Sequence, residues 1–221
     1  MPKDEAQRHR PPGEPRRRST GKARHEQILR AAMECFAENG FSGTTTRSLA
    51  ERVGITEAAL YRYFPSKESL YQAIIDRKIR APELMALVGP AAERRDDRAV
   101  FAGLAREIFR RLEEDPAFLR ILLFTALEGH ALSEPFFASR VRRLREFVAH
   151  YVALRVEEGA FRPVEPALAA RAFLGMIFDH MNVRIVFQQK EVYPQPLDEV
   201  ADTFTSIFLG GVQQLADGKP S

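Results

Sequence analysis

The stretch FSGTTTRSLAERVGITEAALYRYFPSKESL, residues 41–70, contains three short helical patterns separated by turns of only a few residues. The first pattern begins at Thr45 and Thr46, either of which can cap a helix N-terminus with its side-chain oxygen. Leu49 and Val53 lie four residues apart, so they share one apolar face of that helix. The pattern predicts a short amphipathic helix with a polar outer surface.

A turn at Gly54 separates this helix from a second one, for which Thr56 is the natural cap. Leu60 and Phe64 again form an apolar pair four residues apart, and the proline that follows them closes the helix. Ser66 is suited to cap a third helix. Short helices joined by such small turns, one of which contains glycine, are typical of a helix-turn-helix domain.

The second helix of a helix-turn-helix enters the major groove of DNA, so its outward side chains must reach bases and phosphates. Arg62 has the planar fork that reads guanine through two hydrogen bonds, and we expect it to determine specificity. Ala58 is small enough to let the backbone approach the groove, and the hydroxyl of Thr56 suits a phosphate. The neighbouring helix N-termini also favour phosphate. The predicted DNA contacts are Thr45, Thr46, Arg47, Thr56, Ala58, Tyr61, Arg62, Tyr63 and Lys67.

Positive charge is concentrated in the first third of the chain. The 221 residues carry a formal charge of +3. Residues 1–67 contain thirteen Lys and Arg against eight Asp and Glu, so this part carries +5 and the remainder −2. Such an excess attracts a polyanion, although a solvated tail would have the same composition. Residues 1–21, rich in arginine and proline, are predicted to form a disordered basic arm.

The remainder of the chain shows helical periodicity and no alternating strand pattern. Apolar residues recur at helical spacing over 97–114, 116–127, 133–158, 165–188 and 196–215. A proline or a capping residue opens each of these segments, and Gly159 ends the third of them. We therefore predict an all-α protein of about nine helices.

Two domains are expected after the arm. The first is a DNA-binding domain over residues 22–82, with the helix-turn-helix at about 45–64, and the second is a larger helical bundle over residues 83–221. The boundary is placed near Pro82–Pro90, because two prolines and a glycine interrupt the helical periodicity there.

Several classes of function lack their motifs in this sequence. There is no phosphate-binding Gly-x-x-x-x-Gly-Lys loop, no His-Glu-x-x-His metal helix and no Gly-x-Ser-x-Gly elbow, so we expect no catalytic residue, metal or cofactor. From about Lys22 to a stop at Asn39-Gly40, helical spacing predicts another helix, and Cys35, the single cysteine, falls on its inward face. No secretory signal or membrane-spanning stretch is found, which predicts a cytoplasmic protein. An α-helical enzyme and a non-specific architectural DNA protein remain as alternatives.

The motifs of residues 22–82 resemble the DNA-binding signature of TetR-type (TetR/AcrR) transcriptional regulators. They are the Gly-Phe-x-x-Thr-Thr entry, the Leu-Ala-x-x-Val-Gly-Ile turn, Leu-Tyr-x-Tyr-Phe and Lys-x-x-Leu. The resemblance implies a homodimer that represses transcription at a palindromic operator and leaves it when a small ligand enters the second domain. An activator of the same fold is the alternative. The positions that match DNA contacts in the family are Thr45, Thr56, Ala58, Tyr61, Tyr63 and Lys67.

Two positions depart from the pattern of the family. Ala58 stands where many members have glycine, which puts the closest backbone approach to DNA in doubt. Glu57 often has a basic or small counterpart, so its carboxylate would repel phosphate or accept a hydrogen bond from cytosine.

A ligand pocket is expected in the second domain because of the resemblance. Thirteen of the sixteen phenylalanines lie beyond residue 100, where a helical bundle could enclose an apolar cavity for a small hydrophobic effector. The alternative for each phenylalanine is an ordinary place in the core. His130 is a second possible polar anchor beside His180. The predicted pocket residues are Phe101, Leu104, Phe124, Leu127, Phe147, Tyr151, Phe173, Met176 and His180.

The last two helices, about 165–188 and 196–215, carry apolar stripes. Two such helices from each subunit could form an intermolecular four-helix bundle, which is the dimer contact that the resemblance implies. A dimer would set two recognition helices at half-sites roughly 34–36 Å apart. As a hypothesis, a bound ligand would push the helix that begins at Ser66 and change this spacing.

Overall fold

The computed structural model describes residues 21–213, and the predicted arm 1–21 lies outside them except for Gly21. These residues form helices and connecting loops, and within them the only β-type contact is an isolated bridge between Phe161 and Gln213. The expectation of an all-α protein is confirmed. The first helices are α1 (Gly21–Gly43), α2 (Thr46–Val53), α3 (Glu57–Tyr61) and α4 (Lys67–Ile79).

The helices of the second half are longer. They are α5 (Leu84–Glu93), α6 (Asp97–Glu114), α7 (Pro116–Leu127), α8 (Glu134–Phe136), α9 (Arg142–Glu157), α10 (Pro166–Met181) and α11 (Leu197–Val212). A 3-10 turn, Ala131–Ser133, precedes α8, while π-helical turns Phe137–Val141 and Asn182–Val186 lead into α9 and follow α10. The helix predicted over 133–158 therefore exists, with a π-helical turn inside it.

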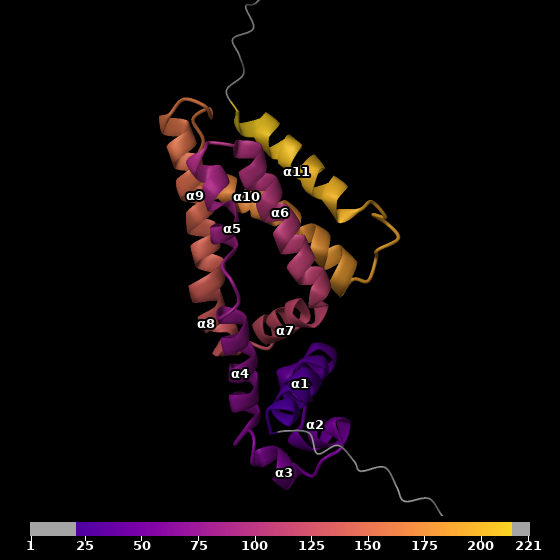
Figure 1. Cartoon of the computed structure of the whole chain (residues 1–221). Helices are drawn as coiled ribbons and strands as arrows, with labels where there is room; N and C mark the ends of the chain where they lie inside the picture. Colours follow the sequence, from indigo (N-terminus) through magenta and orange to yellow (C-terminus); the bar gives the residue numbers. More distant parts are fainter. Residues whose placement is uncertain (1–20, 214–221) are drawn as a thin grey trace, which may run out of the picture.

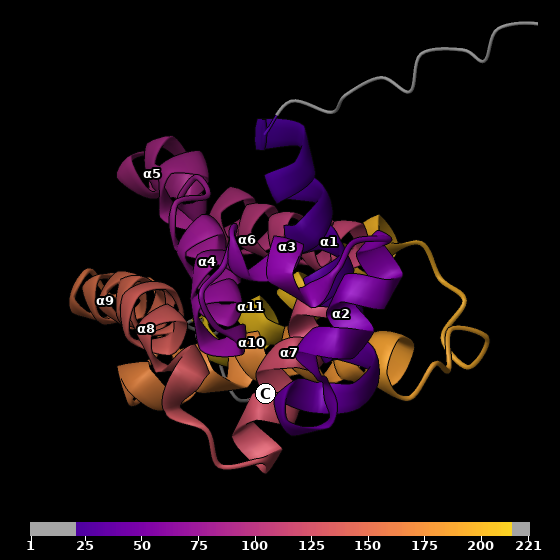
Figure 2. The same ribbon diagram turned by 90° about the horizontal axis from the view of Figure 1, so that it is seen from below.

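The molecule is elongated, with α2 and α3 at one end (Figure 1). Helices α5, α6, α9, α10 and α11 make up the opposite part, and α7 lies across the junction between the two parts (Figure 1). Seen from the end that carries α2 and α3, these short helices lie in front of the remaining bundle (Figure 2). The helix-turn-helix is therefore presented at an exposed end of the chain.

The predicted helix caps are present in the helix-turn-helix. Thr45 Oγ1 accepts a hydrogen bond from the Ser48 amide at 3.1 Å, and Thr56 Oγ1 accepts one from the Ala59 amide at 3.1 Å. Gly54 has a φ of 72°, a left-handed conformation that glycine adopts without strain, so α2 ends there. Each cap occupies one of the amides that a helix N-terminus leaves unpaired.

Two hydrophobic cores lie on either side of α7. The first contains buried side chains of α1–α4, including Phe36 and Cys35, and burial raises the pKa of the Cys35 thiol. The second extends from α5 to α11 and is centred on phenylalanines. Phe118, Ile121 and Leu122 of α7 belong to the first core, whereas Leu119 of the same helix belongs to the second. The predicted boundary at residue 82 follows the chain between α4 and α5, but the first core continues beyond it into α7.

The expected interruption of the helical pattern near Pro82–Pro90 is wrong in part. Pro82 does lie in the connection before α5, but Gly89 and Pro90 lie inside that helix. Pro90 lacks the N–H that would bond to the preceding turn. Burial of the adjacent Val88 and Ala91 in the second core offsets this loss.

Glu107 of α6 makes the folded state sensitive to acid. Its carboxylate accepts hydrogen bonds from Arg110 at 2.6 Å and Arg111 at 2.7 Å, which together lower the pKa of this carboxyl from 4.5 to about 2. A depressed folded-state pKa contributes stability that is present above the unfolded pKa and is lost as pH falls toward the folded one. We expect stability to fall between about pH 5 and pH 2, and the slope to be shallower in Glu107→Gln. Urea unfolding at a series of pH values measures both slopes, and equal slopes would contradict the assignment.

Candidate DNA-binding and effector sites

The outward side chains of α3 and of the residues that follow it are exposed. Tyr61 is 47% exposed and Tyr63 is 39% exposed, large values for aromatic side chains, and Arg62 and Ala58 are exposed beside them. Leu60 between them is buried in the first core, as its spacing from Phe64 predicts. The predicted face of α3 is therefore free to meet a groove of DNA, while its contacts with DNA stay a prediction.

Polar contacts tie the two short helices together. The Tyr61 hydroxyl donates a hydrogen bond to Thr46 Oγ1 at 3.3 Å, and the Thr46 hydroxyl donates one to Glu57 Oε1 at 3.4 Å. The Tyr61 ring is therefore held across the start of α2. The Glu57 carboxylate thus accepts a hydrogen bond from within the protein. This contact gives the acid a structural role at a position where the sequence suggests repulsion of phosphate.

The two arginines of the predicted set differ in their partners. Arg47 Nε donates to Glu51 Oε1 at 3.0 Å in an exposed ion pair. Arg62, in contrast, forms no ion pair with any residue between 21 and 213, so its guanidinium is available for a partner from outside the chain. It lines a surface hollow together with Arg24, Ile55, Ala59 and Tyr63.

Arg24 is a basic residue of this face that sequence reasoning missed. Arg24 lies in the first turns of α1. It lines the same hollow as Arg62, although the two residues are 38 positions apart in the chain. The concentration of positive charge before residue 67 was the available signal, but it could not indicate which arginine reaches α3.

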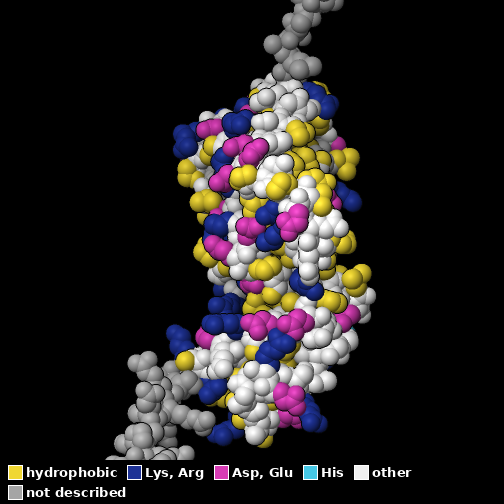
Figure 3. Space-filling view, turned by 90° about the vertical axis from the view of Figure 1, so that its right-hand side faces the viewer, with side chains coloured by type: hydrophobic (Ala, Val, Ile, Leu, Met, Phe, Trp, Pro, Cys, Tyr) yellow, Lys and Arg dark blue, Asp and Glu magenta, His cyan; other side chains and the backbone are white. Residues whose placement is uncertain are grey.

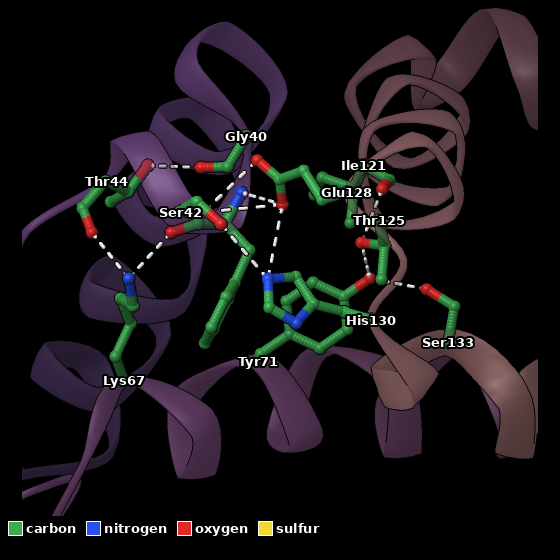
Figure 4. A network of polar contacts seen from close by, with 11 residues as sticks. Gly40, Ser42, Thr44, Lys67, Tyr71, Ile121, Thr125, Glu128, His130 and Ser133 are labelled. Atoms are coloured by element: carbon green, nitrogen blue, oxygen red, sulfur yellow. Dashed lines mark hydrogen bonds and ion pairs between the residues drawn. The ribbon is translucent and has the colours of Figure 1, made fainter.

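Lys67 has an internal role that the sequence does not reveal. Its Nζ donates hydrogen bonds to the carbonyl oxygens of Phe41 at 2.7 Å and Thr44 at 2.9 Å (Figure 4). The same ammonium lies 4.2 Å from the centre of the Phe41 ring, a favourable cation–π distance. Two of its three donors thus hold the turn Phe41–Thr44, which follows the kink of α1 at Gly40. One donor is left for the predicted contact with phosphate.

Four of the predicted pocket residues are buried together in the second core: Phe101, Leu104, Tyr151 and Phe173. The ring of Phe101 lies 4.9 Å from that of Phe173 and 4.7 Å from that of Phe208, so these rings pack directly on one another. Phe147 and Met176 are partly buried against the same core. Phe208 was not among the predicted residues, since the α11 stripe was interpreted as a dimer contact.

Three residues proposed for the pocket or its polar anchor lie elsewhere, and for them the prediction is wrong. Leu127 is 86% exposed. The Phe124 ring lies beside Gly40 of α1 and is not part of the second core. The His130 ring nitrogen contacts the Ser42 hydroxyl at 3.0 Å. The reason is the orientation of α7, whose apolar residues are divided between two cores. Sequence periodicity shows that a helix has an apolar face but not which neighbour covers it.

His180 occupies an apolar site at the end of α10. It is 7% exposed, and its ring lies 5.6 Å from that of Phe109 and 5.7 Å from that of Phe204. Burial, assisted by the positive charge of Arg184, lowers the pKa of His180, which favours the neutral ring. Within the described chain, His180 Nε2 and the Oγ1 of the fully buried Thr205 have no hydrogen-bond partner.

Known protein families match both parts of the chain. A model described as bacterial regulatory proteins, tetR family, matches residues 28–74, and one described as AefR-like transcriptional repressor, C-terminal domain, matches residues 103–211. The chain belongs to the TetR family. It is a DNA-binding transcriptional regulator, as the resemblance of its helix-turn-helix implied, and its second part matches the C-terminal domain of a transcriptional repressor.

Individual TetR relatives agree with this assignment. The HTH-type transcriptional regulator RutR of Escherichia coli (strain K12) is 31% identical over 147 residues, which are 65% of this chain and 67% of RutR. The nucleoid occlusion factor SlmA of Vibrio cholerae is 30% identical over 168 residues, 72% of this chain and 82% of SlmA. The crystal structure of the TetR-family regulator PfmR from Thermus thermophilus has a TM-score of 0.64 at 29% identity, covering 85% of this chain and 99% of PfmR.

The comparisons point to a TetR regulator rather than to any class of enzyme. Between residues 21 and 213 there is no group of three metal-ligating side chains that could hold an ion. No helix in that range is long and apolar enough to span a membrane.

Proposed function

We propose that this TetR regulator represses transcription by binding a palindromic operator as a homodimer, and that a small hydrophobic effector releases it. The exposed face of α3 carries the proposal, together with the guanidinium of Arg62 at its end, which forms no ion pair with residues 21–213. Arg62 reads a guanine in the major groove, and Tyr61 contacts the DNA beside it. The N-termini of α2 and α4 position the protein on phosphates. A repressor bound in this way lies in the cytoplasm with the nucleoid.

The proposed dimer contact uses the outer faces of α10 and α11. Leu168 of α10 is 64% exposed and Ile207 of α11 is 60% exposed, although both are large aliphatic side chains. The face of the molecule on which α11 lies shows apolar side chains among charged ones (Figure 3). Covering them with the same helices of a second subunit removes this apolar surface from water. The predicted helix 196–215 includes residues 214 and 215, which lie outside the described part.

The effector is proposed to enter the second core near the aromatic residues. His180 Nε2 and Thr205 Oγ1 are buried and have no hydrogen-bond partner among residues 21–213, and a buried polar atom without a hydrogen bond costs free energy. A ligand with an apolar body and one hydrogen-bonding group would satisfy such an atom. Phe101, Phe173 and Phe208 already pack on one another, so the ligand must separate helices of the second core to enter. The resulting movement of these helices is proposed to shift the DNA-binding end.

Selection of genomic DNA fragments by the purified full-length protein, at one stated salt concentration, tests the proposed function. We expect a short palindrome to be enriched. Arg62→Ala should bind it about tenfold to a hundredfold less tightly, because a bidentate contact to guanine is lost. Tyr61→Ala should also weaken binding. Arg145→Ala is the matched control, since Arg145 is exposed on α9 and its loss changes the charge equally.

Two results would contradict the proposal. One is the absence of any enriched fragment. The other is equal weakening by Arg62→Ala and Arg145→Ala, because this would show a general effect of charge in place of base recognition. Native mass spectrometry of the same preparation would show whether a small molecule is bound and whether the protein is a dimer.

A further inference from the structure

The turn Phe41–Thr44, which follows the kink of α1 at Gly40 and leads toward α2, is held from two sides by charged side chains (Figure 4). Lys67 of α4 binds two of its carbonyl oxygens, as described above. Its amides face the opposite direction, toward Glu128, the residue that follows the last turn of α7. The turn is therefore fixed by one cation from the DNA-binding helices and one anion from α7.

Glu128 binds two successive amides of this turn. The Phe41 amide donates to Glu128 Oε2 at 3.2 Å, and the Ser42 amide donates to Oε1 at 3.2 Å and Oε2 at 3.3 Å. The side chain of Glu128 is 19% exposed, so it is largely shielded from water. His130 lies beside this pair, with its Nε2 at 3.0 Å from the Ser42 hydroxyl and 3.8 Å from Glu128 Oε2. A carboxylate is the side chain best suited to accept from two amides at once.

Gly40 makes room for the carboxylate. Its φ of 72° turns the chain sharply at the end of the regular part of α1 and exposes the amides that follow. A Cβ at this position would lie 2.3 Å from Glu128 Oε1 and 3.3 Å from the Phe124 ring. Only glycine therefore allows α7 to approach the turn this closely. The glycine in the turn and the carboxylate of Glu128 are therefore both needed for this contact.

The turn leads directly into the DNA-binding surface. Thr44 donates a hydrogen bond from Oγ1 to the Gly40 carbonyl at 2.7 Å, and the next residue, Thr45, is the cap of α2. We propose that Glu128 is a positioning residue for operator binding, which holds the Phe41–Ser42 amides and thereby sets the start of α2 against DNA. This role rests on the proposed function, because it requires that α2 and α3 bind an operator.

Charge alone predicts the opposite effect. A carboxylate near a DNA-binding surface repels phosphate, so its removal should strengthen binding to DNA in the absence of a positioning role. Glu128→Gln keeps the shape of the side chain but replaces one acceptor oxygen by an NH₂ donor that faces other donors. If Glu128 positions the turn, the substitution weakens binding although it removes a negative charge. The sign of the change therefore separates the two explanations.

The test compares full-length Glu128→Gln with Glu146→Gln, a control that removes the same charge from an exposed position on α9. Affinities for the selected operator and for unrelated DNA are measured at one salt concentration and at a temperature well below both unfolding midpoints. We expect Glu128→Gln to bind the operator about tenfold less tightly than Glu146→Gln. The two Gln variants should bind unrelated DNA with equal affinity. Glu128→Asp, which keeps the carboxylate, should recover part of the lost operator affinity.

Three outcomes would overturn the role of Glu128 while leaving the proposed function intact. The first is operator binding by Glu128→Gln that equals or exceeds that of Glu146→Gln. The second is a parallel loss of affinity for operator and for unrelated DNA, which indicates general damage to the fold. The third is the absence of any recovery in Glu128→Asp. If the wild-type protein itself selects no operator, the proposed function fails and the role of Glu128 fails with it.

Discussion

Replacing Phe101 by alanine is expected to lower the free energy of unfolding by about 3–5 kcal/mol. The side chain is fully buried at the centre of the second core, with rings of Tyr151, Phe161, Phe173 and Phe208 around it. Its removal takes apolar surface out of the core and leaves a cavity that the surrounding helices fill only in part. Urea denaturation followed by far-ultraviolet circular dichroism measures the change.

Leu127→Ala is the control for this prediction. Leu127 also belongs to the predicted pocket, but at 86% exposure it should change stability by no more than about 0.5 kcal/mol. A loss below about 1 kcal/mol in Phe101→Ala would contradict the expectation, since it would mean that the ring faces a void or a mobile neighbour instead of a packed core. The comparison thus decides between the two interpretations of the aromatic residues, packed core or open pocket.

Replacing Asp97 by asparagine is expected to cost about 3 kcal/mol of stability or more. The Asp97 carboxylate accepts hydrogen bonds from Tyr151 Oη at 2.7 Å and from Arg155 at 2.8 and 3.1 Å, and so joins the start of α6 to α9. The side chains of Asp97 and Arg155 are only 12% and 13% exposed. Burial, together with the hydrogen bond to Asp97, raises the pKa of Tyr151, which stays a neutral donor. The substitution would leave the shielded Arg155 with Glu158 as its remaining ion-pair partner among the described residues.

The exposed pair Arg47–Glu51 provides the matched control, because its side chains are 81% and 66% exposed. Glu51→Gln should leave the unfolding midpoint in urea almost unchanged, since water solvates both groups. Equal effects of Asp97→Asn and Glu51→Gln would show that the Asp97 pair is solvated in solution, contrary to the structure.

Features that depend on a few adjacent residues could be predicted from the sequence. The caps at Thr45, Thr56 and Ser66 and the end of α2 at Gly54 are present because each is determined by a side chain or a glycine within three or four residues of the helix end. The exposed face of α3 follows from the four-residue spacing of Leu60 and Phe64. The density of these local signals also explains why the TetR resemblance was correct.

Features that depend on contacts between distant segments could not be predicted. Lys67 is typical of the start of a helix, and nothing near it in the chain indicates that it binds the carbonyls of Phe41 and Thr44. Glu128 likewise follows an apolar helix, a position where many acids are simply solvated, so its contact with the Phe41 and Ser42 amides could not be expected. The assignment of Leu127 to the pocket was wrong for a related reason, because the rotation of α7 is set by packing against two cores that periodicity does not locate.

Helix α7 also limits how such a regulator could exchange its ligand-sensing part with another. A junction placed at residue 82 would deprive the first core of Phe118, Ile121 and Leu122, and with them of the carboxylate of Glu128. A single junction placed beyond Glu128 would keep these side chains, but it would also retain α5 and α6. Phe101 and Leu104 of α6 belong to the second core and would have to fit a foreign bundle. The DNA-binding core is therefore formed by α1–α4 together with α7, a unit that is discontinuous along the chain.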